Sequence, residues 1–141
     1  MDRRRPRNPP TRLLVVDDDD DTREMYVQSF VFFGFEAIGA ADCDEAHRRA
    51  WDDHPDIVVT DLTLRNGDGW QLVQDLKREP RTRDIPVVLL TGHAAPALRE
   101  RAEHEGCAGF FVKPCLPDEL ATEVRHVLGR TNVPKGSSSL P

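Results

Sequence analysis

Short apolar runs recur along the chain at regular intervals, and this spacing is the strongest constraint on its fold. The runs cover residues 13–16, 36–40, 57–60, 87–90 and 109–112. Four of them are continuously or almost continuously apolar, which is typical of parallel strands that are covered on both faces. The second run, 36–40, is less apolar, and we expect it at an edge of the sheet.

Stretches with helical character separate these runs. We expect helices over residues 22–33, 44–53, 69–79, 96–106 and 117–129, with glycine or proline marking most of their ends. Strands that alternate with helices in this way predict an α/β domain, a doubly wound sheet of five parallel strands with helices on both faces. Ligands of such sheets bind beyond the carboxyl ends of the strands.

Chemically reactive side chains follow four of the apolar runs. The first run leads into aspartates 17–21, the third into Asp61, the fourth into Thr91 and the fifth into Lys113. Because the carboxyl ends of parallel strands meet at one edge of a sheet, we expect these side chains to lie together. Each residue type has an ordinary structural explanation when taken alone, so the inference depends on the combination.

The aspartates create an electrostatic problem that a cation would solve. Asp17, Asp18 and Asp61 would lie within a few ångströms of one another, and carboxylates that close repel. Mg²⁺ is bound by one or two carboxylates together with water and phosphate oxygens. We therefore predict a Mg²⁺ site with Asp18 and Asp61 as ligands and with Asp17 acting through water.

The same set of residues is suited to phosphoryl transfer, which needs positioning and charge neutralisation more than covalent help. The Asp61 carboxylate is the expected nucleophile and would form an acyl phosphate. The Lys113 ammonium can pair with one phosphoryl oxygen, and the Thr91 hydroxyl can donate to another.

Length and composition fit one globular domain. The chain has 141 residues, of which 38% are hydrophobic and 31% charged. We expect a disordered arm at 1–11, the folded domain at 12–129 and a flexible tail at 130–141, with no attached output domain.

No apolar run approaches the roughly 20 residues of a membrane-spanning helix, and the net charge of −6 argues against nucleic-acid binding by this domain. Three widely spaced cysteines fit reduced thiols in a cytoplasmic protein.

Four segments resemble, in order, those of response-regulator receiver domains: VVDDD, PDIVVTDLTLRNGDGWQL, VVLLTGHA and GFFVKPCLPDEL. The resemblance covers about residues 12–129. It implies a flavodoxin-like (βα)5 fold and a Mg²⁺-dependent, phospho-accepting signalling domain rather than an enzyme. The phosphoryl donor would be a phosphohistidine of a sensor histidine kinase or a histidine phosphotransfer protein. A downstream protein target and a phosphorylation-dependent homodimer are the other partners implied.

The resemblance assigns site roles by position. Asp17 and Asp18 look like the acidic pair, Asp61 like the phospho-acceptor and Lys113 like the site lysine. The backbone carbonyl of Thr63 would be a further metal ligand.

The resemblance also implies a switch. Thr91 looks like the switch hydroxyl and Phe110 like the switch aromatic, and a cis peptide would precede Pro114. Phosphorylation would draw Thr91 inward and let Phe110 turn inward, which changes the face made by the fourth helix, fifth strand and fifth helix. Arg65 departs from the family pattern, since many members have proline there, and the loop after Asp61 is expected to be more mobile.

Two alternatives remain open at this point. Asp18, Asp20 and Thr22 spell DxDxT, as in haloacid-dehalogenase-type phosphatases, whose nucleophile would be Asp18. That interpretation leaves Asp61 without a role, and it lacks the acidic pair expected after the lysine. The second alternative is a pseudo-receiver, a binding module that never takes phosphate, although all the expected reacting residues are present.

The first predicted helix carries the apolar run Phe30, Val31, Phe32 and Phe33. These residues place apolar groups on more than one side of a helix, and core packing is the main interpretation. An alternative is that one ring is exposed and docks a partner, for which Phe30 is the residue to test.

Overall fold

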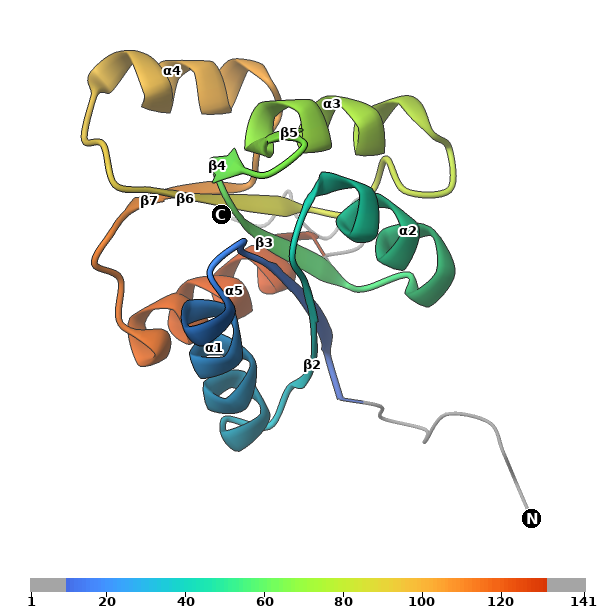
Figure 1. Ribbon diagram of the computed structural model, residues 1–141, viewed down its shortest axis with the longest axis vertical. Coiled ribbons are helices and arrows are strands. Elements are labelled where there is room, and N and C mark those ends of the chain that lie inside the picture. Colours follow the sequence, from blue (N-terminus) through green and yellow to red (C-terminus); the bar gives the residue numbers. More distant parts are fainter. Residues whose placement is uncertain (1–9, 132–141) are drawn as a thin grey trace, which may run out of the picture.

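The computed structural model describes residues 10–131 and contains a five-stranded parallel sheet (Figure 1). The strand order is β2-β1-β3-β6-β7. The strands are β1 (Arg12–Val16), β2 (Glu36–Ala40), β3 (Ile57–Asp61), β6 (Val87–Thr91) and β7 (Gly109–Val112). All neighbouring pairs run parallel, and β2 lies at an edge as expected. The sequence prediction of five parallel strands is confirmed.

Helices cover both faces of this sheet. They are α1 (Asp20–Phe32), α2 (Cys43–Asp53), α3 (Gly69–Arg78), α4 (Pro96–His104) and α5 (Pro117–Thr131). Figure 1 shows α1 and α5 on one side of the sheet and α2, α3 and α4 on the other. This is the doubly wound, flavodoxin-like arrangement that the alternating pattern predicts.

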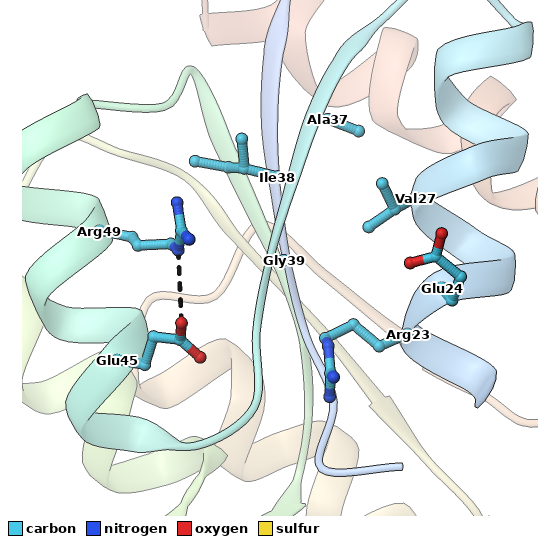
Figure 2. Close-up of a pocket in the computed structure, with 8 residues that line it drawn as sticks. All are labelled: Arg23, Glu24, Val27, Ala37, Ile38, Gly39, Glu45 and Arg49. Atoms are coloured by element: carbon cyan, nitrogen blue, oxygen red, sulfur yellow. Dashed lines mark ion pairs between the residues drawn. The ribbon is translucent and has the colours of Figure 1, made fainter. Parts of the chain in front are cut away.

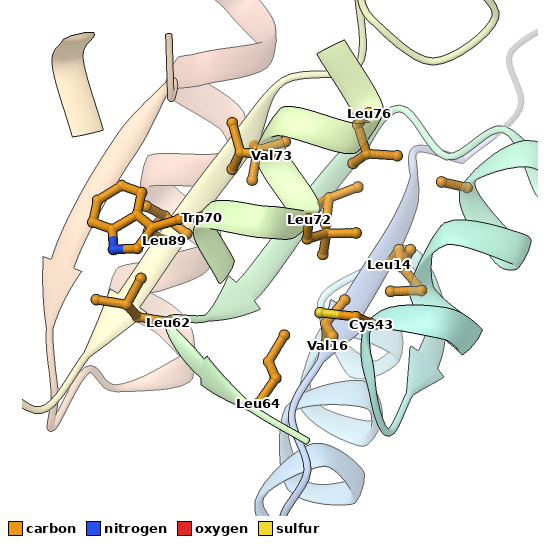
Figure 3. Close-up of a cluster of buried hydrophobic side chains, with 14 of the residues drawn as sticks. Leu14, Val16, Cys43, Leu62, Leu64, Trp70, Leu72, Val73, Leu76 and Leu89 are labelled. Atoms are coloured by element: carbon orange, nitrogen blue, oxygen red, sulfur yellow. The ribbon is translucent and has the colours of Figure 1, made fainter. Parts of the chain in front are cut away.

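Each face of the sheet has its own hydrophobic core. In β1, Leu14 and Val16 pack with the helices α2 and α3, whereas Leu13 and Val15 pack on the side of α1 and α5. Figure 3 shows the first of these cores, where Leu72 and other residues of α3 lie over the strands. Side chains of a strand alternate between faces, so a strand buried on both sides must be apolar throughout.

Several helix ends differ from the predicted ones by one or two residues, and two of these differences have a clear local cause. Helix α1 begins two residues earlier than expected, because the Asp19 carboxylate caps it by accepting a hydrogen bond from the Thr22 amide at 2.9 Å. Helix α5 continues through Gly129 to Thr131, since Gly129 does not adopt the positive φ that Gly34 and Gly106 show. The predicted arm and tail lie almost entirely outside the described residues.

The loop after Asp61 forms a small element that the sequence did not reveal. Strands β4 (Thr63–Leu64) and β5 (Gly67–Asp68) make an antiparallel hairpin. Arg65 and Asn66 connect the two strands, and Asn66 and Gly67 have positive φ values of 57° and 121°. An isolated bridge joins Arg65 to Asp42, the residue that caps α2. Strands this short carry no periodic signal, which is why the pattern missed them.

The aromatic run of α1 divides between core and surface. Phe30 is fully buried, stacks with Tyr26 and meets Phe35 edge to face, whereas Phe32 is 85% exposed. Phe30 is therefore a core residue, as the main interpretation predicts, and it is not the exposed ring. The exposed ring is that of Phe32, and partner docking through it stays a prediction. Among the described residues, none of the helices combines the length and the apolar character that a membrane crossing requires.

Candidate functional site

Three carboxylates converge at the carboxyl edge of the sheet. Asp17 follows β1, Asp18 comes next, and Asp61 is the last residue of the neighbouring strand β3. One carboxylate oxygen from each lies within 4.8 Å of the others. Asp17 is only 3% exposed. The parallel register therefore brings together the three aspartates that the sequence analysis selected.

Lys113 provides the counter-charge. It follows β7 and extends across the end of β6, which places its Nζ 2.6 Å from Asp61 Oδ1 and 3.5 Å from Asp17 Oδ2. Asp61 Oδ1 is buried and receives no well-aligned hydrogen bond from the described residues, so its contact with the ammonium is mainly electrostatic. One ammonium thus faces two of the three carboxylates.

The pKa values show how strongly these groups interact. Burial raises the pKa of Asp61 to about 6; Lys113 acts in the opposite direction, and the nearby Asp17 carboxylate adds to the increase. Burial alone would lower the pKa of Lys113, but the Asp61 and Asp17 carboxylates raise it overall. The site therefore holds more negative charge than one lysine can offset.

Thr91 occupies the strand end between Asp61 and Lys113. It is the last residue of β6, and its side chain is buried. Its hydroxyl oxygen accepts a hydrogen bond from the His93 amide at 3.1 Å, and its carbonyl accepts one from the Lys113 amide at 2.7 Å. Gly92 leaves open space beside it.

Backbone contacts hold the acidic loop in place, and sequence reasoning missed most of them. The Asp17 carboxylate accepts a hydrogen bond from the Asp19 amide at 2.9 Å. Arg23 donates to the carbonyl of Asp17, and Arg65 donates to the carbonyl of Asp18. A single arginine in a helix or loop gives no sequence signal for such a contact.

Residues 13–125 match the response regulator receiver domain family. The chain belongs to this family. A receiver domain is a phospho-accepting signalling module, not a conventional enzyme, and receiver domains partner with histidine kinases.

Relatives of this receiver domain include longer regulators. The phosphate regulon transcriptional regulatory protein PhoB of Escherichia coli is 37% identical over 97 residues, which cover 69% of this chain and 42% of PhoB. PhoB of Pseudomonas aeruginosa is 32% identical over 119 residues, which cover 84% of this chain and 51% of PhoB. The receiver domain thus spans about half the length of these curated relatives. The expectation that no output domain is attached stays a prediction.

Solved structures agree with the fold. The chemotaxis response regulator CheY4 of Vibrio cholerae superposes with a TM-score of 0.78 at 25% identity, over 84% of this chain and 98% of that one. The receiver domain of the Francisella response regulator 1452 gives a TM-score of 0.80 at 25% identity, over 86% and 98%. The flavodoxin-like receiver fold is therefore confirmed.

The acidic cluster of the receiver domain has a donor set that fits Mg²⁺. Carboxylate oxygens are the ligands that this hard cation accepts, and a cation bound by only a few of them keeps several waters. Asp18 and Asp61 are partly exposed and can share a cation, while buried Asp17 stands behind them. Thr63 lies in β4 with its side chain exposed, and the contribution of its carbonyl stays a prediction.

The two residues that are predicted to form the switch, Thr91 and Phe110, lie on neighbouring strands. Phe110 is 6% exposed and packs in the core on the side of α4, one strand away from Thr91. The guanidinium of Arg99 lies over the Phe110 ring at 5.1 Å from its centre. The Lys113–Pro114 peptide bond is cis, as the resemblance implied.

Proposed function

We propose that this receiver domain accepts a phosphoryl group on Asp61, in a Mg²⁺-dependent reaction, from a phosphohistidine of a sensor histidine kinase or a histidine phosphotransfer protein. The observation that carries this proposal is the placement of the Asp61 carboxylate, which lies with Asp17 and Asp18 inside 4.8 Å and 2.6 Å from Lys113. An acceptor needs a nucleophile, a counter-charge and a cation site in contact, and these residues supply all three.

The transfer itself is an in-line displacement. An oxygen of the ionised Asp61 carboxylate forms a bond to phosphorus while the bond from phosphorus to the imidazole nitrogen breaks. The imidazole keeps the electron pair, and the product is an acyl phosphate. Lys113 moves its contact from the carboxylate to a phosphoryl oxygen, and the Thr91 hydroxyl donates to another. Asp18 and Asp61, with Asp17 behind them, would hold a Mg²⁺ ion, which would neutralise charge on the phosphoryl oxygens.

The output of the switch would be a change of the face formed by α4, β7 and α5. Two observations support this choice. Thr91 and Phe110 lie on adjacent strands, and a cavity of about 300 Å³ borders the Phe110 ring between α4 and β7. A hydroxyl drawn toward the phosphoryl group would change the packing around Thr91 and Phe110. The partner would be a downstream protein or a second copy of the domain.

We also infer that the domain works in the cytoplasm. Its cysteines, Cys43, Cys107 and Cys115, are free thiols in the structure. Free thiols persist in the reducing cytoplasm, and receiver domains are typically cytoplasmic.

The decisive experiment is phosphorylation with a small donor. Purified protein is incubated with acetyl phosphate and Mg²⁺, and intact mass is measured with and without EDTA. We expect the mass gain of one phosphoryl group only when Mg²⁺ is present, and peptide mapping should locate it on Asp61. No gain under any condition would leave the pseudo-receiver alternative as the correct one.

Two matched variants separate the receiver from the phosphatase alternative. Asp61→Asn should abolish the mass gain, because the nucleophile is gone. Asp18→Asn should slow the gain through weaker cation binding but leave the modified residue unchanged. A phosphoryl group found on Asp18, with Asp61→Asn still reactive, would favour the haloacid-dehalogenase-type mechanism.

A further inference from the structure

Two arginines from different elements donate hydrogen bonds to consecutive carbonyls of the acidic loop. Arg23 of α1 reaches the carbonyl oxygen of Asp17 through Nη1 at 2.8 Å. Arg65 of the β4–β5 hairpin reaches the carbonyl oxygen of Asp18 through Nη2, also at 2.8 Å. These bonds hold the main chain of the loop, so the side-chain carboxylates stay available at the site.

Arg23 is itself well supported. Its stem lies over Gly39 of the edge strand β2, where an added Cβ would come within 3.1 Å of Arg23 Cδ (Figure 2). Its second terminal nitrogen pairs with the Asp20 carboxylate at 2.7 Å. The glycine thus allows the arginine stem to pass closely over the sheet edge toward the loop.

Arg65 is held in place by a different part of the fold, the β4–β5 hairpin. It lies with Asn66 in the turn of the short hairpin, and a bridge ties it to Asp42 at the start of α2. The hairpin follows directly from Asp61 and Leu62. Arg65 therefore links the loop that carries Asp18 to the segment that follows the acceptor strand, 47 residues away in sequence.

We propose that Arg65, acting with Arg23, is a positioning residue that fixes the main chain at Asp17 and Asp18 so that the Asp18 carboxylate meets Asp61 at a shared cation. The proposal rests on the proposed function only in requiring that the site binds Mg²⁺. A loop that is already ordered pays little entropy when the cation binds, whereas a loose loop must be ordered at that moment.

The direction of the change in Mg²⁺ affinity distinguishes a positioning role of Arg65 from an effect of its charge alone. Arg65 carries a positive charge near a cation site, so its charge alone opposes Mg²⁺ binding, and removing that charge would strengthen binding. Removing a positioning hydrogen bond would weaken binding instead. The two explanations predict opposite changes in the dissociation constant.

The test measures Mg²⁺ affinity by isothermal titration calorimetry on the full chain. We expect Arg65→Gln to raise the Mg²⁺ dissociation constant by about three- to tenfold, which corresponds to the loss of one ordinary hydrogen bond. Arg65→Lys keeps the charge and can still donate, so it should recover part of the affinity. Arg78→Gln is the matched control, because it removes the same charge from the far end of α3.

A second variant tests the other side of the loop. Arg23→Gln should also raise the dissociation constant, and its melting temperature in EDTA shows whether the fold is intact. Unchanged or tighter Mg²⁺ binding in Arg65→Gln would overturn the proposal, and so would a wild-type protein that binds no Mg²⁺.

Phosphorylation with acetyl phosphate is measured in parallel on the same proteins. Slower phosphorylation of Arg65→Gln that is restored by higher Mg²⁺ supports positioning through the cation. If the wild-type protein binds Mg²⁺ but takes no phosphate, while Arg65→Gln still weakens the binding, the positioning role stands and the proposed phospho-acceptor function fails.

Discussion

At Asp61, burial raises the carboxyl pKa to about 6, while the Lys113 ammonium at 2.6 Å favours the ionised form. Both the burial of Asp61 and its contact with Lys113 suit the proposed role of phospho-acceptor. In the proposed function the ionised carboxylate is the nucleophile, and incomplete compensation by one lysine favours the binding of a cation. Asp17 adds to this imbalance because it is buried beside Asp61 and shares the same lysine.

The raised pKa of Asp61 predicts that ionisation of this carboxyl lowers the free energy of unfolding of the metal-free protein at high pH. An unfolded carboxyl titrates near 3.9, so the folded state binds the proton more tightly. The resulting stabilisation is fully present below that unfolded pKa and is lost as pH rises through about 6. In EDTA at pH 8, Asp61→Asn should therefore be more stable than wild type by about 1–2 kcal/mol, after allowance for solvent screening.

Urea denaturation at several pH values checks this prediction. The advantage of Asp61→Asn should shrink as pH falls below 6, because the wild-type carboxyl then becomes neutral as well. Saturating Mg²⁺ should remove or reverse the advantage at pH 8. Equal stability of the two proteins in EDTA at pH 8 would show that burial does not disfavour the Asp61 charge.

Among the structural elements, the start of α3 packs closely against the end of β3, next to the proposed acceptor Asp61. An added Cβ on Gly69 would lie 2.8 Å from the Asp61 carbonyl oxygen and 3.0 Å from the Leu62 Cα. The Gly69 amide donates to the Leu62 carbonyl oxygen at 2.6 Å. Glycine at this position therefore lets the helix start directly against the end of β3.

We expect Gly69→Ala to destabilise the domain by about 2 kcal/mol or more, because backbone rather than a flexible side chain must move. Gly92→Ala is the matched control, since the space beside Gly92 is open and its φ is not positive. Chemical denaturation gives both values. A Gly69→Ala protein as stable as the control would mean that β3 and α3 can separate at no cost.

Helix α1 offers a second contrast within one element. Phe30 is buried against Tyr26 and Phe35, whereas Phe32 is exposed. We expect Phe30→Ala to cost about 3–5 kcal/mol and Phe32→Ala to change stability by less than about 0.5 kcal/mol. Urea denaturation of the two variants measures the difference, and similar costs would contradict the assignment of Phe30 to the core.

For the molecule as a whole, the doubly wound topology is what assembles the site. The strand order β2-β1-β3-β6-β7 puts β1 and β3 side by side, so aspartates separated by more than 40 residues meet at one edge. The next strands, β6 and β7, bring Thr91 and Lys113 to the same edge. Cation binding and folding should therefore be linked.

This linkage predicts that Mg²⁺ stabilises the folded domain. At 100 times its dissociation constant the ion should add about 2.7 kcal/mol and raise the melting temperature. Asp18→Ala should abolish most of the increase, whereas Asp84→Ala, an exposed site before β6, should leave it intact. A thermal denaturation series against Mg²⁺ concentration measures the effect, and equal shifts in Asp18→Ala and wild type would contradict the assigned site.

The sequence by itself determined the strands, the helices and the residues at the strand ends. Strands covered on both faces must be apolar throughout, and this local requirement can be read from neighbouring residues. The same reasoning selected Asp17, Asp18, Asp61, Thr91 and Lys113, because residues just after parallel strands share one edge.

Only the tertiary structure decided how these parts fit together. The contact of Arg65 with the Asp18 carbonyl and the close approach of Gly69 to Asp61 join segments that no local pattern connects. The β4–β5 hairpin is too short to leave a periodic signal. Which ring of α1 is buried depends on the rotation of the helix against the sheet, and packing sets that rotation. Such contacts depend on three-dimensional proximity, which the order of residues along the chain does not record.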